Sequence, residues 1–220
     1  DRNLKALTCF TREDKPDQVQ WLVANGFRQT MREPASQLNV SNFDSARFDD
    51  MCEWVADSGI QILSLAELQN RDPDWLQNTY DLCMEVEADV PSTNPFTPLP
   101  MEEFEKGLDG PNFLPDGWFI AVDGTDADSI GPYAGITSLG ASQADAEKLY
   151  TWLTGVRRQY RRRGIALAMK VHAIRYAQQR RIKFIDTDNE ENNSMYQINL
   201  KLGFEPLPAW LEYEKKMVNE

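Results

Sequence analysis

Residues 149–179 read LYTWLTGVRRQYRRRGIALAMKVHAIRYAQQ. The stretch opens with a strand candidate, Leu149–Val156, that is rich in β-branched and aromatic residues. An arginine-rich loop follows, and a helix is predicted from Gly164 because apolar residues recur there at helical spacing. This order of strand, loop and helix predicts an anion site, since the first turn of a helix carries N–H groups without an intrahelical partner.

Small and basic residues mark the point where a ligand would meet this backbone. Gly164 has no Cβ, so a ligand can approach it closely, and Ala166 is nearly as small. Five arginines lie between Arg157 and Arg163, in a chain whose formal net charge is −12. The run is either a solvated loop or a source of charge for a polyphosphate ligand. We favour the second interpretation because the run adjoins a helix N-terminus.

Two motifs resemble those of the GNAT superfamily of acetyl-CoA-dependent N-acetyltransferases. The string 161–166, RRRGIA, resembles the family's Q/R-x-x-G-x-G/A motif, and Thr154-Gly155-Val156 resembles the end of its central strand. The strand candidate Phe184–Asp188, followed by an asparagine-led helix and Gly203-Phe204, resembles its second motif. The resemblance implies an α+β (α/β) fold with a mixed, mostly antiparallel central sheet flanked by helices.

The resemblance also implies acetyl-CoA as a co-substrate. Backbone N–H groups of residues 162–167 would hold its pyrophosphate, and arginine side chains would add charge-assisted contacts. The end of the strand would present backbone groups to the pantetheine arm and the thioester. Asn192 matches a family asparagine that contacts the cofactor. The predicted cofactor-binding residues are Thr154, Gly155, Val156, Arg161, Arg162, Arg163, Gly164, Ile165, Ala166, Leu167 and Asn192.

The catalytic residues of the family have no clear match. Asn199 stands where many members carry a tyrosine acid, and Thr187 stands where many carry a glutamate base. Asp186 and Asp188 flank Thr187 and are predicted to point to the opposite face of the strand. Asn199 and Asp188 are therefore the catalytic candidates. Water-relayed proton transfer, catalysis by proximity and loss of catalysis are the alternatives.

The acceptor pocket is implied by the same resemblance. In the family, the helices and loop that correspond to residues 72–108 shape it. We therefore expect direct attack on the thioester by a primary amine of a small molecule, and the acidic composition suits a cationic one. The alternative is a CoA-binding regulator without turnover. The pocket candidates are Glu85, Glu87, Asp89, Phe96 and Trp118.

A weak internal repeat bears on the domain organisation. The order strand, helix, Gly-Phe occurs near the start of the chain and again from residue 184. We predict that residues 1–45 are the C-terminal portion of a first GNAT-like unit, 46–58 a connector helix and 59–220 a complete GNAT domain. The alternative is an N-terminal extension that docks onto a single domain. Residues 28–31 and 37–40 are expected to form a hairpin.

Composition argues against several other classes of protein. No apolar run is long enough to span a bilayer and no leader is visible, so we expect a cytoplasmic protein without a membrane partner. The three cysteines and the single histidine show no metal-ligand spacing, so no metal is expected. The negative charge argues against nucleic-acid binding, the least favoured alternative for the arginine run. The oligomeric state is not predicted.

Overall fold

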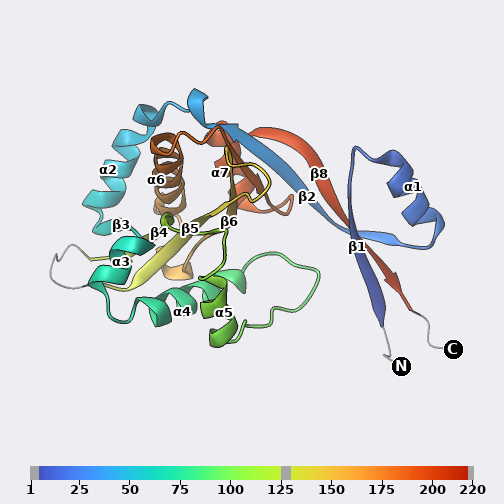
Figure 1. The fold of residues 1–220 in the computed structure, drawn as a ribbon, viewed down its shortest axis with the longest axis horizontal. Helices are drawn as coiled ribbons and strands as arrows, with labels where there is room; N and C mark the ends of the chain where they lie inside the picture. Colours follow the sequence, from blue (N-terminus) through green and yellow to red (C-terminus); the bar gives the residue numbers. More distant parts are fainter. Residues whose placement is uncertain (1–4, 125–129, 218–220) are drawn as a thin grey trace. The chain divides into compact units, whose positions relative to one another are not determined.

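The computed structural model describes residues 5–124 and 130–217 (Figure 1). Eight strands form one mostly antiparallel sheet in the order β1-β8-β2-β7-β6-β5-β4-β3, flanked by helices. The chain divides into two compact units, Leu38–Asp186 and Asp1–Gln37 with Thr187–Glu220. In the described part of the chain, no helix is both long and apolar enough to cross a membrane.

The larger unit, Leu38–Asp186, is a meander that ends in a parallel strand. Strands β3 to β6 pair antiparallel in order, and β7 pairs parallel with β6. The strands are β3 (Ile60–Ser64), β4 (Phe113–Asp123), β5 (Tyr133–Ala141), β6 (Lys148–Val156) and β7 (Phe184–Asp188). The α-helices are α2 (Asp49–Asp57), α3 (Leu65–Arg71), α4 (Trp75–Glu87), α5 (Met101–Gly107) and α6 (Ile165–Gln179). Short 3-10 helices are η1 (Val40–Asn42), η2 (Ser45–Phe48) and η3 (Arg158–Tyr160).

Alternate residues of β4 and β5 pack against helices on opposite faces of the sheet. Ile120 and Ile136 belong to a buried cluster with residues of α3, α4 and α5. Ala121 and Ala134 belong to a second cluster with residues of α2 and α6. Figure 1 shows α6 and α4 on opposite sides of these strands. Because successive side chains point to opposite faces, a strand covered on both sides reads as a continuous apolar run.

The start of α4 differs from the start that its sequence signals. Asp72 as N-cap with Pro73 in the first position is a standard helix start, but the helix begins at Trp75. The Asp72 carboxylate instead accepts hydrogen bonds from the Asp74 N–H at 2.9 Å and the Tyr133 hydroxyl at 2.8 Å. The buried Asp72 carboxylate therefore links the start of α4 to β5, and the helix begins at Trp75, after the turn that this residue stabilises.

The smaller unit combines the first and last parts of the chain. Its strand β8 lies between β1 and β2 and is antiparallel to both. Leu22, Leu211 and Tyr213 form a small core that joins α1 to β8. The elements are β1 (Ala6–Arg12), α1 (Pro16–Ala24), β2 (Arg28–Asn39), α7 (Ser194–Lys201) and β8 (Glu205–Lys216).

The predicted hairpin within residues 28–40 is wrong, because β2 is one strand from Arg28 to Asn39. Its pairing with β8 contains two irregularities, and Pro34 lies at the second one, between Glu33 and Ala35. A proline has no N–H to donate, so it is tolerated where the ladder is interrupted. Two bulges thus replace the expected turn.

The order strand, helix, Gly-Phe, strand is present twice, as β1-α1-β2 and as β7-α7-β8. Gly26 and Gly203 each follow the helix with φ of 83° and 89°. A left-handed residue of this kind ends many helices, and glycine adopts it without steric cost. The helix expected to connect the two parts is η2 followed by α2. The domain boundaries at residues 45 and 58 stay a prediction.

Candidate functional site

Strands β6 and β7 are paired over only part of their length. The ladder runs from Lys148–Phe184 to Tyr150–Asp186, and the described residues show no later pair. An ion pair of 2.9 Å between Lys148 and Asp186 joins the two strands at this paired end. Since β6 continues to Val156, its last residues keep backbone groups free of ladder bonds to β7. A free edge of this kind can bind an extended ligand that carries amide groups.

A bulge in β6 lies beside this free edge. The pairing with β5 shifts between Thr137–Thr154 and Leu139–Thr151, so Trp152 and Leu153 together oppose Ser138. The Ser138 hydroxyl replaces the ladder bonds: it accepts from the Leu153 N–H at 3.0 Å and lies 3.3 Å from the Leu153 carbonyl. Bulges often lie next to active sites, where they redirect side chains. Neither the bulge nor the role of Ser138 follows from the sequence pattern.

Helix α6 begins with a turn whose backbone N–H groups lie outside the helical ladder. Gly164 is the N-cap, with φ of 69° and no side-chain cap, and Arg162 has φ of 65°. The Ala168 N–H donates to the Gly164 carbonyl at 3.0 Å. Among the described residues, the N–H groups of residues 162–167 have no acceptor. Successive amides in this conformation form an anion-binding concavity. The structure therefore brings the predicted pyrophosphate-binding residues together in one turn.

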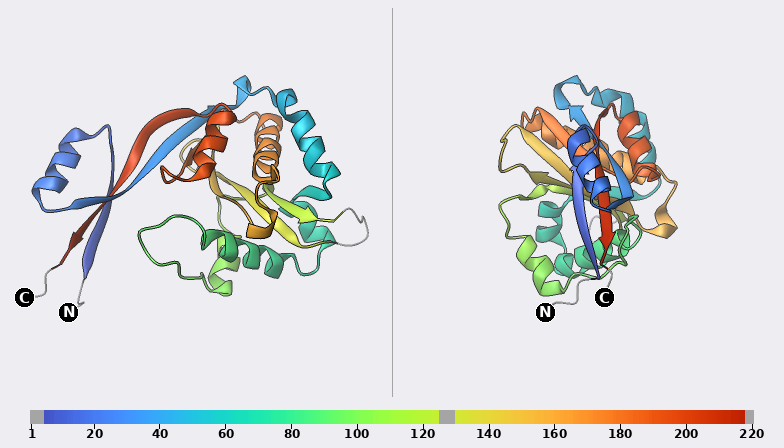
Figure 2. Two further views of the ribbon diagram at one scale, coloured as in Figure 1. Left: turned by 180° about the vertical axis from the view of Figure 1, so that it is seen from behind. Right: turned by 90° about the vertical axis from the view of Figure 1, so that its right-hand side faces the viewer.

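Helix α2 packs against the outer side of this turn. The two helices lie side by side in Figure 2 and share one buried cluster. A Cβ added to Gly164 would lie 3.3 Å from the side chains of both Trp54 and Val55. A side chain at position 164 would therefore point into α2. Glycine is favoured there by its left-handed conformation and by this close packing.

Protein carboxylates engage most of the arginine run. Arg158 and Arg161 both form ion pairs with Asp89, and Arg161 Nε also donates to the Val156 carbonyl at 2.8 Å. The hydrogen bond from Arg158, with that from Arg161, lowers the pKa of Asp89 to about 2. Asp89, a predicted pocket residue, thus ties the loop after α4 to the loop before α6.

Two further arginines of the run also have protein partners. Arg157 Nε lies 3.1 Å from a carboxylate oxygen of Glu85, another predicted pocket residue. Arg163 donates to the Ser58 carbonyl at 3.1 Å. Arg162 is exposed, and no side-chain partner is found for it in the described ranges. An anionic ligand at this turn would therefore meet the backbone amides and Arg162 first.

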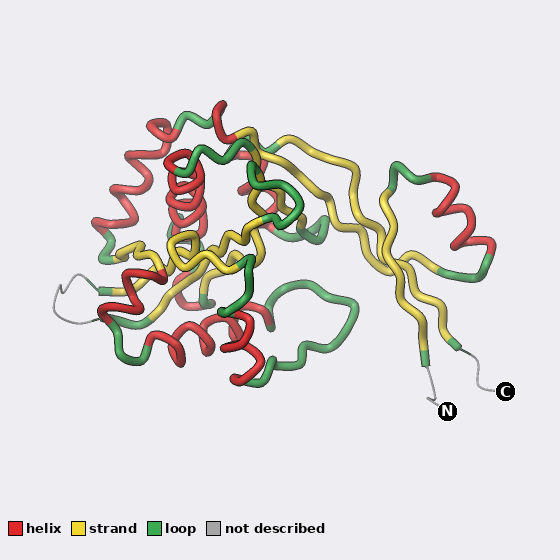
Figure 3. The backbone as a smooth tube through the Cα atoms, in the orientation of Figure 1, coloured by secondary structure: helices red, strands yellow, loops and turns green. Residues whose placement is uncertain are grey.

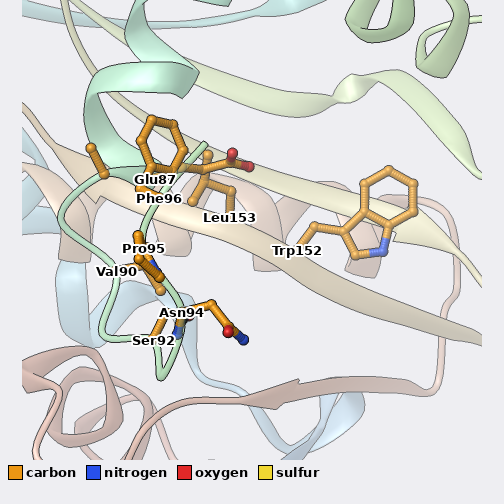
Figure 4. Close-up of a pocket in the computed structure, with 9 residues that line it drawn as sticks. Glu87, Val90, Ser92, Asn94, Pro95, Phe96, Trp152 and Leu153 are labelled. Carbon is orange, nitrogen blue, oxygen red and sulfur yellow. Dashed lines mark hydrogen bonds between the residues drawn. The ribbon is translucent and has the colours of Figure 1, made fainter. Parts of the chain in front are cut away.

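A hollow of about 550 Å³ lies beside the bulge (Figure 4). The residues that line it come from the end of α4, from the long loop that follows α4 and from strand β6. Loops are green in Figure 3. Of the predicted pocket residues, Glu87 and Phe96 line it. Trp152 and most of the loop residues were not predicted, although an aromatic side chain exposed on a strand is a usable signal. The lining residues are Glu87, Ala88, Val90, Ser92, Asn94, Pro95, Phe96, Trp152 and Leu153.

Two glycines fix the walls of this hollow. A Cβ on Gly140 would lie 2.2 Å from the Trp152 ring, so the ring lies directly over this glycine. Trp118, a predicted pocket residue, is buried behind it and meets the Trp152 ring edge to face at 6.5 Å. A Cβ on Gly155 would lie 2.1 Å from a methyl group of Val86. The end of α4 and the Trp152 ring are thus held against the sheet by close packing.

The predicted catalytic residues belong to the smaller unit. Asn199 is fully buried, and its Nδ2 donates to Asn189 Oδ1 at 2.7 Å. Asp188 is the last residue of β7, and partial burial of its carboxyl raises its pKa. Asn192 donates through its backbone and its side chain to Glu190. Catalysis by Asn199 and Asp188 and cofactor binding by Asn192 stay predictions. In the described residues, no group of three or more His, Cys, Asp and Glu is placed to hold a metal ion.

Comparisons with known proteins identify the fold. No family model matches the sequence, and no curated protein matches it. A GCN5-related N-acetyltransferase from Sphaerobacter thermophilus has a TM-score of 0.71 at 19% identity, over 96% of this chain and 59% of that one. A tandem GNAT protein from the clavulanic acid biosynthesis pathway has a TM-score of 0.68 at 17% identity, over 98% and 65%.

A third solved structure comes from the NatC complex bound to Gag peptide and CoA. It has a TM-score of 0.52 at 17% identity, over 72% of this chain and 99% of that one. The present chain spans less than two thirds of the length of the first two structures. At these identities the likeness shows the fold alone. The protein has the fold of the GCN5-related N-acetyltransferases.

Proposed function

We propose that the protein transfers an acetyl group from acetyl-CoA to a primary amine of a small molecule. The observation that carries the proposal is the connection between β6 and α6. It places a strand end that has no ladder bonds to β7 next to a helix start whose N–H groups have no acceptor among the described residues. Acetyl-CoA offers the matching chemistry, an amide-bearing arm that ends in a pyrophosphate. The fold shared with N-acetyltransferases supports the same function.

The residues present fit the pyrophosphate, the amide-bearing arm and the acetyl group of this co-substrate. The amides of residues 162–167 would hold the pyrophosphate, and the free edge of β6 would bind the arm through backbone hydrogen bonds. The acetyl group would then lie near the bulge at Leu153, beside the hollow. Holding both reactants there supplies the proximity on which the transfer depends.

Binding of acetyl-CoA is tested by calorimetric titration of the Arg162→Asp variant. A carboxylate beside the free amides repels the pyrophosphate, and we expect affinity to fall about tenfold, equal to about 1.4 kcal/mol. Arg181→Asp is the matched control, because Arg181 is also exposed and has a positive φ, 58°, but follows α6 instead of preceding it. Equal affinities for the two variants would remove the site from the proposal.

A second candidate function is a CoA-binding regulator without turnover. Asn199 favours it, because it replaces the expected acid, is buried and is bonded to Asn189. Release of free thiol from acetyl-CoA in the presence of primary amines separates the two candidates. Amine-dependent release supports the transferase, and saturable binding without release supports the regulator.

A further inference from the structure

Three acidic residues, Glu85, Glu87 and Asp89, occupy alternate positions at and just after the end of α4, and two of them form ion pairs. Glu85 is paired with Arg157, and Asp89 is paired with two arginines. Glu87 lies between them in the sequence. Among the described residues, its carboxylate has no ion pair and no hydrogen-bond donor. The arginine run thus neutralises Glu85 and Asp89 and leaves the Glu87 carboxylate available for another cation.

Glu87 is also the acid that lines the hollow beside β6 (Figure 4). Val86, the residue before it, is packed against Gly155, which fixes the end of α4 against the face of the sheet at the end of β6. Leu153, at the bulge, lines the same hollow. The Glu87 carboxylate therefore borders the space next to the expected position of the acetyl group. Glu87 is exposed as a whole residue, but partial removal of its carboxyl from water raises its pKa.

The remaining walls of the hollow are mostly apolar. Phe96 and Trp152 contribute aromatic rings, and Val90 and Pro95 contribute aliphatic groups. The Trp152 ring is held by Gly140 and Trp118, so this wall is formed before any ligand enters. Apolar, partly aromatic walls with one carboxylate suit a ligand that has a cationic head and an apolar body.

We propose that Glu87 accepts the proton of the acceptor ammonium, and that the acceptor is a primary amine on an apolar body of about the size of one aromatic ring. The proposal rests on the proposed transferase function. One ammonium proton passes to Glu87, which leaves a neutral amine with a free electron pair. The nitrogen then bonds to the thioester carbon, the C–S bond breaks, and the second proton of the former ammonium reaches the thiolate. Glu87 returns its proton to water.

The test uses 2-phenylethylamine as the acceptor probe and the variant Glu87→Gln. We expect kcat/KM for the amine to fall about 100-fold and the acidic limb of the pH profile to disappear, because glutamine cannot accept the proton. Glu87→Asp, which keeps a carboxylate, should retain that limb. Glu105→Gln is the control: Glu105 is an exposed acid on α5, outside the hollow, and its variant should behave as the unchanged protein.

Direct binding keeps the two claims separate. We expect 2-phenylethylamine to bind the CoA-loaded protein in calorimetry, with at least tenfold weaker binding of 2-phenylethanol, which has no charge. Equal binding of the alcohol, or tighter binding of spermidine, overturns the substrate class. Turnover with an unchanged acidic limb in Glu87→Gln overturns the role of Glu87 and leaves the transferase function standing. Absence of acetyl-CoA binding by the unchanged protein overturns both.

Discussion

Replacing Gly155 by alanine would place a methyl group where the side chain of Val86 already lies. The added Cβ would be 2.1 Å from Val86 Cγ1, while the next atoms of Val86 are at 3.3 Å and 3.4 Å. Both residues are buried, so neither can move into solvent. The contact joins the end of α4, which carries Glu87, to the end of β6. Its integrity therefore bears on the hollow as well as on stability.

The size of the effect follows from this geometry. Overpacking of a buried site costs about 1–3 kcal/mol, which is the expected loss for Gly155→Ala. Val86→Ala removes two buried methyl groups, at about 0.8 kcal/mol each before any cavity is counted, so a loss of about 2 kcal/mol is expected. The double variant deletes the atom that clashes. It should be about as stable as Val86→Ala alone, with a coupling energy of about 1–3 kcal/mol.

Urea denaturation of the four proteins measures this coupling as a double-mutant cycle. Thiol release with 2-phenylethylamine, measured on the same proteins, should fall in Gly155→Ala and recover in part in the double variant. If the two single losses add to within about 0.5 kcal/mol, Val86 does not fill the space at Gly155 and the placement of Glu87 over β6 is refuted.

Three further outcomes are expected. Arg162→Gly should raise the free energy of unfolding by about 1 kcal/mol, because glycine adopts the left-handed conformation without steric strain. Urea denaturation measures this change, and Arg181→Gly is the positive control. The lowered pKa of Asp89 means that its ion pairs stabilise the folded protein, by about 1 kcal/mol after screening at the exposed Arg158. This stabilisation is present above the pKa of the unfolded state and is lost as pH falls toward 2. Across that pH range, the melting temperature of Asp89→Asn should therefore fall less than that of the unchanged protein. Partial removal of the Glu87 carboxyl from water raises its pKa, so the charged form disfavours the folded state increasingly as pH rises through that pKa. Glu87→Gln should therefore unfold at a higher temperature than the unchanged protein at neutral pH, and the difference should shrink in acid.

The fold was predictable where local chemistry determines structure. The unit formed by β6, the loop and α6 follows from residue pattern, a left-handed glycine and helix periodicity, all of which act within a few residues. The start of α4 was not predictable, because Asp72 is held by Tyr133, which lies 61 residues away. The hairpin failed for a related reason. Pro34 normally marks a turn, but pairing with β8 accommodates it at a bulge.

In the candidate site too, local features could be predicted from the sequence and features that depend on distant contacts could not. The amides at the start of α6 could be inferred from the sequence because any helix has them. The partners of the arginines could not, since Asp89 and Glu85 come from a distant helix and loop. Trp152 and Ser138 depend on a bulge, which is a property of two strands together. Sequence periodicity describes each strand alone.

The position of β8 between β1 and β2 has a consequence for any attempt to cut the chain. Residues 205–216 close the C-terminal part of the protein, yet their hydrogen-bonding neighbours come from residues 6–12 and 28–37. A protein shortened to residues 46–220 would expose both edges of this strand, and unpaired strand edges promote association between molecules. We expect the shortened chain to aggregate, and light scattering after expression would show it. The two similar segments thus pair with each other through β8, so the internal repeat alone does not mark a position where the chain can be cut.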